Sequence, residues 1–144
     1  MNARALVAGL IAISILTVGT SIYFRSTVAP FEKSFSSALS PNGRFKAVRL
    51  VVQRQTPPAY CEASVSIYLA AYPDSFAETE KSYTVYAAPC PTPADPASLP
   101  SVQWLADDAV QITYKSSPQA GDITKLRRRV VDASRAVRVN YVER

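Results

Sequence analysis

The chain has 144 residues, a net charge of +5 at pH 7 and no histidine. Such a length leaves room for one domain beyond an apolar N-terminus. Without histidine, the Ser-His-Asp and Cys-His catalytic systems and nearly all zinc sites are excluded.

The N-terminal region predicts a membrane anchor. Residues 5–24 form an uncharged stretch of 20 residues. As a helix this stretch would be about 30 Å long, the thickness of a bilayer's hydrocarbon core. We predict a cytoplasmic tail at 1–4 and a transmembrane anchor, or uncleaved signal, at 5–24. A cleaved signal peptide with Thr17 and Gly19 before the cut is the alternative, but apolar residues continue past it to Phe24.

A turn signal follows the anchor. We interpret the mixed residues 25–39 as a stem, so that an exported β domain covers residues 40–144. Asn42-Gly43 supplies the positive φ angles of a tight reversal. In the strand expected after it, the apolar alternation changes phase at Arg49, which predicts either a bulge or a strand covered on both faces.

The next part of the chain predicts strands and a stiff loop. Residues 63–69 and 83–87 alternate apolar with polar side chains, as half-buried strands do. Residues 88–100 hold five prolines. They are neither central strand nor helix, and we expect an extended loop pinned by Cys90.

Two hairpins are predicted in the last third. The first joins strands near Trp104 and Tyr114 through a turn with two aspartates. The second sets residues 126–131 against 136–142. With no helical period after residue 40, the pattern predicts an all-β domain: an antiparallel meander of about seven strands, closed as a sandwich or a small barrel.

The two cysteines indicate the compartment. Cys61 and Cys90 lie in a β domain without a CxxC motif, which favours a disulfide over a metal site or two unconnected thiols. Disulfides persist outside the reducing cytosol. We therefore expect a single-pass protein of the inner (cytoplasmic) membrane whose C-terminal domain lies in the periplasm or extracellular space.

One local motif resembles a known family. The run Leu39-Ser40-Pro41-Asn42-Gly43-Arg44-Phe45-Lys46-Ala47-Val48 resembles the opening of a blade in TolB-like β-propellers, and residues 102–112 are similar to a blade's closing hairpin. The chain is too short for a complete propeller. The whole also resembles a family of short, uncharacterised bacterial membrane-anchored proteins with an exported β domain. The resemblance implies β architecture and bacterial origin and brings no catalytic residue.

The remaining motifs argue against catalysis. No glycine-rich phosphate loop or Ser-x-x-Lys spacing occurs. Asp107 and Asp108 are adjacent, as turn residues are, rather than facing each other across a substrate. We expect no enzyme, no cofactor and no metal.

Basic residues gather near the C-terminus, where seven of the sixteen Lys and Arg lie within residues 125–144. In a strand, Arg127 and Arg129 share one face and Arg128 points to the other. That face either meets acidic lipid, lipopolysaccharide phosphate or an acidic protein, or guards an edge strand against aggregation. Nucleic acid is not an expected partner of an exported domain.

Two functional hypotheses follow. The first is a membrane-tethered, non-catalytic module that docks on an envelope protein, with Arg127, Arg129, Pro91 and Pro93 as its candidate interaction surface. The second is a periplasmic inhibitor or immunity protein whose proline-rich loop plugs the active site of a hydrolase or toxin. A preordered loop loses little entropy on binding and suits both.

Overall fold

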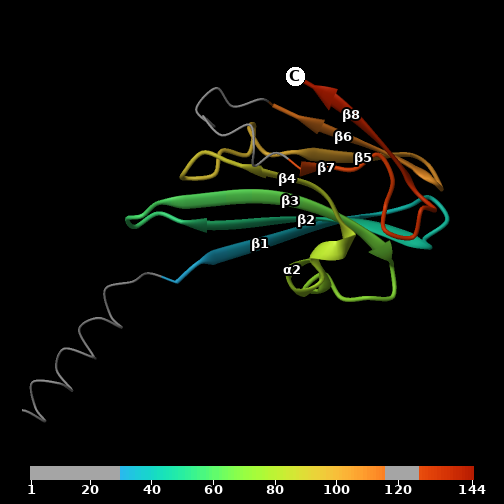
Figure 1. The fold of residues 1–144 in the computed structure, drawn as a ribbon, viewed down its shortest axis with the longest axis horizontal. Coiled ribbons are helices and arrows are strands. Elements are labelled where there is room, and N and C mark those ends of the chain that lie inside the picture. Colours follow the sequence, from blue (N-terminus) through green and yellow to red (C-terminus); the bar gives the residue numbers. More distant parts are fainter. Residues whose placement is uncertain (1–29, 116–126) are drawn as a thin grey trace, which may run out of the picture. The chain divides into compact units, whose positions relative to one another are not determined.

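The computed structural model describes residues 30–115 and 127–144. Their strands form a five-stranded sheet in the order β1-β2-β3-β4-β7 and a three-stranded sheet in the order β5-β6-β8. Figure 1 shows the smaller sheet lying over one face of the larger. The strands are β1 (Glu32–Leu39), β2 (Phe45–Arg54), β3 (Tyr60–Leu69), β4 (Thr84–Pro89), β5 (Ser101–Ala106), β6 (Ala109–Tyr114), β7 (Arg127–Arg128) and β8 (Arg138–Glu143).

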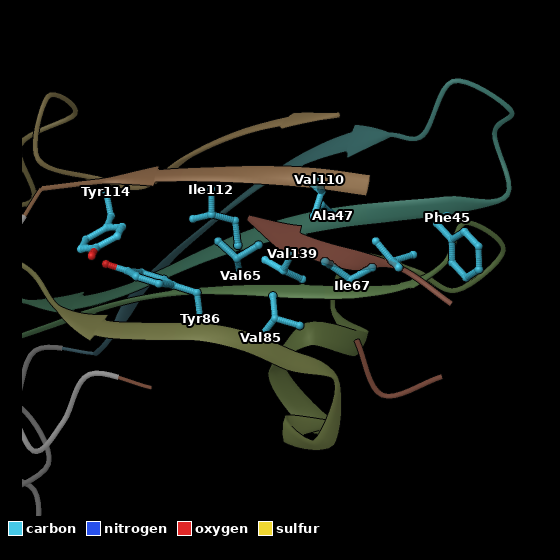
Figure 2. Close-up of a cluster of buried hydrophobic side chains, with 11 residues drawn as sticks. Phe45, Ala47, Val65, Ile67, Val85, Tyr86, Val110, Ile112, Tyr114 and Val139 are labelled. Atoms are coloured by element: carbon cyan, nitrogen blue, oxygen red, sulfur yellow. The ribbon is translucent and has the colours of Figure 1, made fainter. Parts of the chain in front are cut away.

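The facing sides of the two sheets share one apolar core. Phe45, Ala47, Val65 and Ile67 of the larger sheet are buried with Val110, Ile112 and Val139 of the smaller one. Figure 2 shows these side chains between the layers, with Phe45 at one end and Tyr86 and Tyr114 at the other. Because side chains alternate along a strand, this core defines an inner face of the larger sheet and an outer face turned away from the smaller sheet.

The outer face is partly covered by two short helices, α2 (Phe76–Thr79) and η1 (Lys81–Tyr83), which lie between β3 and β4. Val48 and Tyr68 are buried there against α2. This cover explains the phase change in β2, which is buried on both faces and keeps a continuous register with both neighbours. The expectation of half-buried alternation in residues 63–69 is also wrong, because Ser64, Ser66 and Tyr68 are buried as well.

The β1 strand extends the sheet further toward the N-terminus than the sequence pattern predicts. Residues 32–39, within the segment interpreted as a stem, pair along their full length with β2. Trp104 of β5 donates a 2.9 Å hydrogen bond from Nε1 to the carbonyl oxygen of Ala38. Edge strand β1 is therefore tied to both sheets.

The meander prediction holds only in part. The fold is mostly β, with two sheets, but both sheets are open, so a closed barrel is wrong. The absence of helix after residue 40 is also wrong, because α2 and η1 each form a single turn. The hairpin β5-β6 is confirmed, with Trp104 opposite Val110.

The predicted last hairpin is wrong beyond its turn. Val131 bridges Arg138, and Asp132 closes the reversal by accepting a 2.7 Å hydrogen bond from the Val137 amide. From there the strands diverge. β7 pairs with β4, whereas β8 runs parallel to β6. β7 extends the larger sheet and β8 extends the smaller one, so the chain crosses from one sheet to the other between them. The arrangement is therefore not a purely antiparallel meander.

The predicted tail and anchor, residues 1–4 and 5–24, lie outside the described residues. Within residues 30–115 and 127–144, no helix has the length and apolar character needed to cross a bilayer.

Candidate functional site

A pocket of about 560 Å³ opens on the outer face, at the end of the sheet that α2 leaves uncovered. Ser64, Thr84 and Ala87 of β3 and β4 line it, and their register places them side by side. Polar and charged side chains surround this floor. The rest of the lining that matters chemically comprises Tyr60, Glu62, Thr92, Lys81, Arg127 and Arg129. We call it the outer-face pocket.

The three consecutive arginines separate as strand alternation requires. Arg127 lies opposite Ala87 and lines the pocket, as does Arg129. Arg128 belongs to the core side, where its Nη1 donates a 2.7 Å hydrogen bond to the Tyr114 hydroxyl. Its guanidinium carbon lies 5.4 Å from the Tyr114 ring centroid and 6.0 Å from that of Tyr141. One arginine therefore supports the fold and two face the pocket.

The pocket holds polar groups that the fold leaves without partners. Among the described residues, the Arg127 guanidinium has no hydrogen bond, ion pair or ring contact, and neither does the Ser64 hydroxyl. Ser64 is only 5% exposed and lines the pocket. The hydroxyl oxygen itself stays in contact with solvent, since no buried side-chain oxygen or nitrogen of the described residues lacks a hydrogen bond, and it can therefore bond a ligand atom in the pocket.

The other cations are partly engaged. Arg129 donates a 2.8 Å hydrogen bond from Nη1 to the Ser82 carbonyl oxygen. Lys81 makes a long contact of 3.4 Å to the Ala77 carbonyl oxygen. Both contacts are made to neutral backbone oxygens, so the two positive charges remain uncompensated there.

One carboxylate faces these cations. Glu62 accepts a 2.8 Å hydrogen bond from the Tyr60 hydroxyl. Desolvation, together with this hydrogen bond, raises the pKa of Tyr60 to about 12, so the phenol stays protonated at neutral pH. The lining thus carries three cationic side chains and one carboxylate, which leaves it positive.

The disulfide forms one wall. Cys61 and Cys90 are joined, with a Cα–Cα distance of 5.0 Å, which confirms the predicted pair. Disulfides of this kind are typical of an oxidising, extracytoplasmic compartment. The bond holds the start of the proline-rich loop against β3, and Gln53 accepts a 3.0 Å hydrogen bond from the Ala94 amide further along. The loop is therefore fixed at two points.

The candidate surface predicted from the sequence is only partly assembled at the pocket. Arg127 and Arg129 line it, but Pro91 and Pro93 do not. Thr92 lies between the two prolines and contributes instead. The prolines are half-buried and exposed, respectively, in the adjoining loop.

Sequence reasoning missed most of the lining, including Tyr60, Glu62, Ser64 and Lys81. Tyr60, Glu62 and Ser64 alternate with the apolar residues of β3, so a polar outer face was detectable from their spacing. Lys81 carries no such signal. It reaches the pocket only because the connection between β3 and β4 folds back as α2 and η1.

The motif that resembles the opening of a propeller blade forms the turn between β1 and β2. The Ser40 side chain is buried, accepts a 3.0 Å hydrogen bond from the Phe45 amide and lies 2.9 Å from Asn42 Oδ1. Gly43 has a φ of 68°, the left-handed conformation that glycine adopts without steric cost. These contacts stabilise the β1-β2 reversal.

Acidic residues do not form a metal centre in the part of the chain that the structure describes, since no three His, Cys, Asp or Glu side chains gather there. Asp108 lies in the β5-β6 turn and pairs with Arg138 at 3.3 Å, both side chains being exposed. The cationic side chains of the pocket suit the binding of an anion.

The chain matches no protein-family model, and no curated protein or solved structure is significantly similar to it. The resemblance to TolB-like blades and to membrane-anchored bacterial proteins therefore stays a prediction, and any assignment of function must come from the pocket itself.

Proposed function

We propose that this protein is a membrane-tethered, non-catalytic interaction module whose small β-sandwich domain docks on an envelope protein outside the cytosol. The anchor at residues 5–24 would hold it in the inner membrane. The disulfide supports the location, because such a bond is stable in an oxidising space. The docking surface is the outer-face pocket and the proline-rich loop beside it.

The observation that carries the proposal is the Arg127 guanidinium, which has no partner among the described residues and lies beside a pocket wall tied by the disulfide. Arginine is enriched at interfaces, where a desolvated and well-paired guanidinium often dominates the binding energy. The disulfide and the Gln53–Ala94 hydrogen bond hold the wall in place before binding, which lowers the entropy cost of association.

Site-specific photo-crosslinking in intact cells tests the docking surface. A photoreactive amino acid replaces Thr92 in the full chain, and the matched control places it at Leu105, an exposed β5 residue. We expect position 92 to crosslink to a discrete envelope protein and position 105 not to do so. Equal products at both positions, or none at position 92, would contradict the proposal.

The second candidate is an inhibitor or immunity protein, favoured by one observation. The loop between β4 and β5 is tied at Cys90 and Ala94 yet leaves Pro93 exposed, as in a segment presented to another protein's cleft. A chain without residues 1–25 should still protect cells if the protein is an inhibitor. A docking module should instead lose its effect in cells, because its anchor sets its position.

A further inference from the structure

We infer that the outer-face pocket receives a carboxylate from an acidic segment of the partner protein. The inference rests on the proposed docking function and names the chemistry that the partner brings. It follows from the groups that the fold leaves unpaired, from the balance of charge and from the mixed character of the walls.

The donors suit an oxyanion. Arg127 presents a planar guanidinium, which binds a carboxylate through two parallel N–H···O bonds. Ser64 of β3 lies opposite Ala87, which in turn lies opposite Arg127, and its hydroxyl lines the pocket without a hydrogen-bond partner among the described residues. An acidic side chain entering the pocket would bond both groups at once, and each is otherwise solvated.

The charge balance favours an anionic ligand. Glu62 faces the same space as Lys81, Arg127 and Arg129, so one negative charge already opposes three positive ones. The net positive charge of this lining attracts a ligand carboxylate. The Tyr60 hydroxyl is directed at Glu62 and keeps that carboxylate paired.

The walls favour a peptide over a lipid headgroup. Ala59, Ala87, Pro89 and the disulfide line the pocket beside the charged groups. A glutamate side chain has an apolar stem and a charged end, so it can contact both kinds of surface. The volume of about 560 Å³ exceeds what one small anion fills and falls in the range of ligand-binding pockets.

The alternative explanation is that Arg127 and Arg129 only guard the edge of the sheet. β7 is the outermost strand of its sheet, where charged side chains discourage pairing with another chain. Protection of a sheet edge requires charge but no defined binding site. The two explanations therefore differ in whether an acidic peptide binds and in whether replacing Ser64 weakens that binding.

Titration calorimetry on the full chain in uncharged detergent tests the inference. The probe is a short peptide of alternating Glu and Gly with blocked ends, and the control peptide carries Gln in place of Glu. We expect the Glu peptide alone to bind, with affinity that falls as salt rises. Arg127→Gln should weaken binding about tenfold or more, and Ser64→Ala by a smaller factor.

The matched control is Arg138→Gln, which removes the same charge from an exposed site that pairs with Asp108. It should change affinity by less than about twofold. Lys81→Gln serves as a second pocket variant if Arg127→Gln is poorly folded, and Trp104 fluorescence reports folding in each case.

Three results would overturn the inference: no binding of the Glu peptide, equal losses in Arg127→Gln and Arg138→Gln, or tighter binding of inorganic phosphate or phosphatidylglycerol vesicles than of the Glu peptide. The docking proposal is judged separately. If position 92 still crosslinks to an envelope protein while the Glu peptide fails to bind, the docking proposal is retained and the inference of a carboxylate ligand is rejected.

Discussion

The two ends of the outer face of the five-stranded sheet differ in a way that explains both the fold and the site. At one end Tyr68 of β3 is 1% exposed and packs beneath Phe76, with ring centroids 5.2 Å apart. At the other end of the same strand, Glu62 and Ser64 line the open outer-face pocket.

The difference comes from the β3-β4 connection, which covers only one end of the strand, and not from the strand itself. The connection after β3 folds back over Tyr68, whose hydroxyl donates to the Asp74 carbonyl oxygen at 3.1 Å. Burial, with the nearby Asp74 charge, raises the pKa of Tyr68 to about 12. Near its end the connection brings Lys81 into the lining of the pocket. One segment therefore completes the core at one end and supplies a cation at the other.

The largest effect is expected from removing the buried aromatic residue under this cover. Tyr68→Ala should lower the free energy of unfolding by about 3–5 kcal/mol, because it leaves a cavity beneath Phe76 and Tyr83. Tyr72→Ala, at a side chain that is 43% exposed, is the control and should cost less than about 1.5 kcal/mol. Denaturant unfolding followed by Trp104 fluorescence measures both. Similar losses of unfolding free energy in the two variants would mean that the connection does not bury Tyr68 in a core.

The next largest loss of stability should come from removing the disulfide that forms one wall of the pocket. Replacing Cys61 and Cys90 together with serine should lower the free energy of unfolding by about 2–4 kcal/mol, since the unfolded chain regains the entropy that the cross-link removes. The same denaturant titration, with and without reductant, measures it. Reductant should destabilise the native protein and leave the double variant unchanged, and a native protein indifferent to reductant would refute the structural role.

A smaller effect should separate the two sides of β7. Arg128→Gln should cost about 1–2 kcal/mol, because it removes the hydrogen bond to Tyr114 and the contacts with two aromatic rings. Arg127→Gln should change stability by less than about 0.5 kcal/mol. Thermal unfolding by circular dichroism compares them. The reverse order would show that Arg127 serves the fold rather than a ligand.

The smallest effect concerns the ion pair under the covered end. The Lys46 ammonium lies 2.6 Å from Asp74 Oδ1, and this hydrogen bond lowers the pKa of the Asp74 carboxyl. A lowered folded pKa means that the pair stabilises the protein above the unfolded pKa of about 4, and that this contribution is lost as the pH falls through the folded value.

Asp74→Asn should therefore cost up to about 1 kcal/mol at pH 7, a cost that shrinks as the pH falls below about 4. Unfolding free energies of the variant and the native protein across that pH range measure the effect. Asp108→Asn, at an exposed ion pair, is the control and should change stability by less than about 0.5 kcal/mol throughout. A constant difference for Asp74→Asn at every pH would contradict the linkage.

Much of the fold could be predicted from local pattern. The turn at Asn42-Gly43, the hairpin β5-β6 and the opposite directions of Arg127 and Arg128 all follow from backbone preference or strand alternation. The partners of the last strands could not be predicted in this way. Residues 127–128 and 138–143 lie close in sequence, so a hairpin was the simplest expectation, but the free edges of β4 and β6 were visible only in the assembled sheets.

The sequence by itself determined that the domain is built of strands, that Cys61 and Cys90 pair, and that histidine-based chemistry is absent. Those properties depend on residue type and short-range spacing. Only the tertiary structure decided that Ser64, Lys81 and Arg127 share one pocket while Arg128 joins the core. The reason is physical: which surface a side chain meets depends on how the layers pack and where the β3-β4 connection crosses, and both are set by long-range contacts that no local pattern encodes.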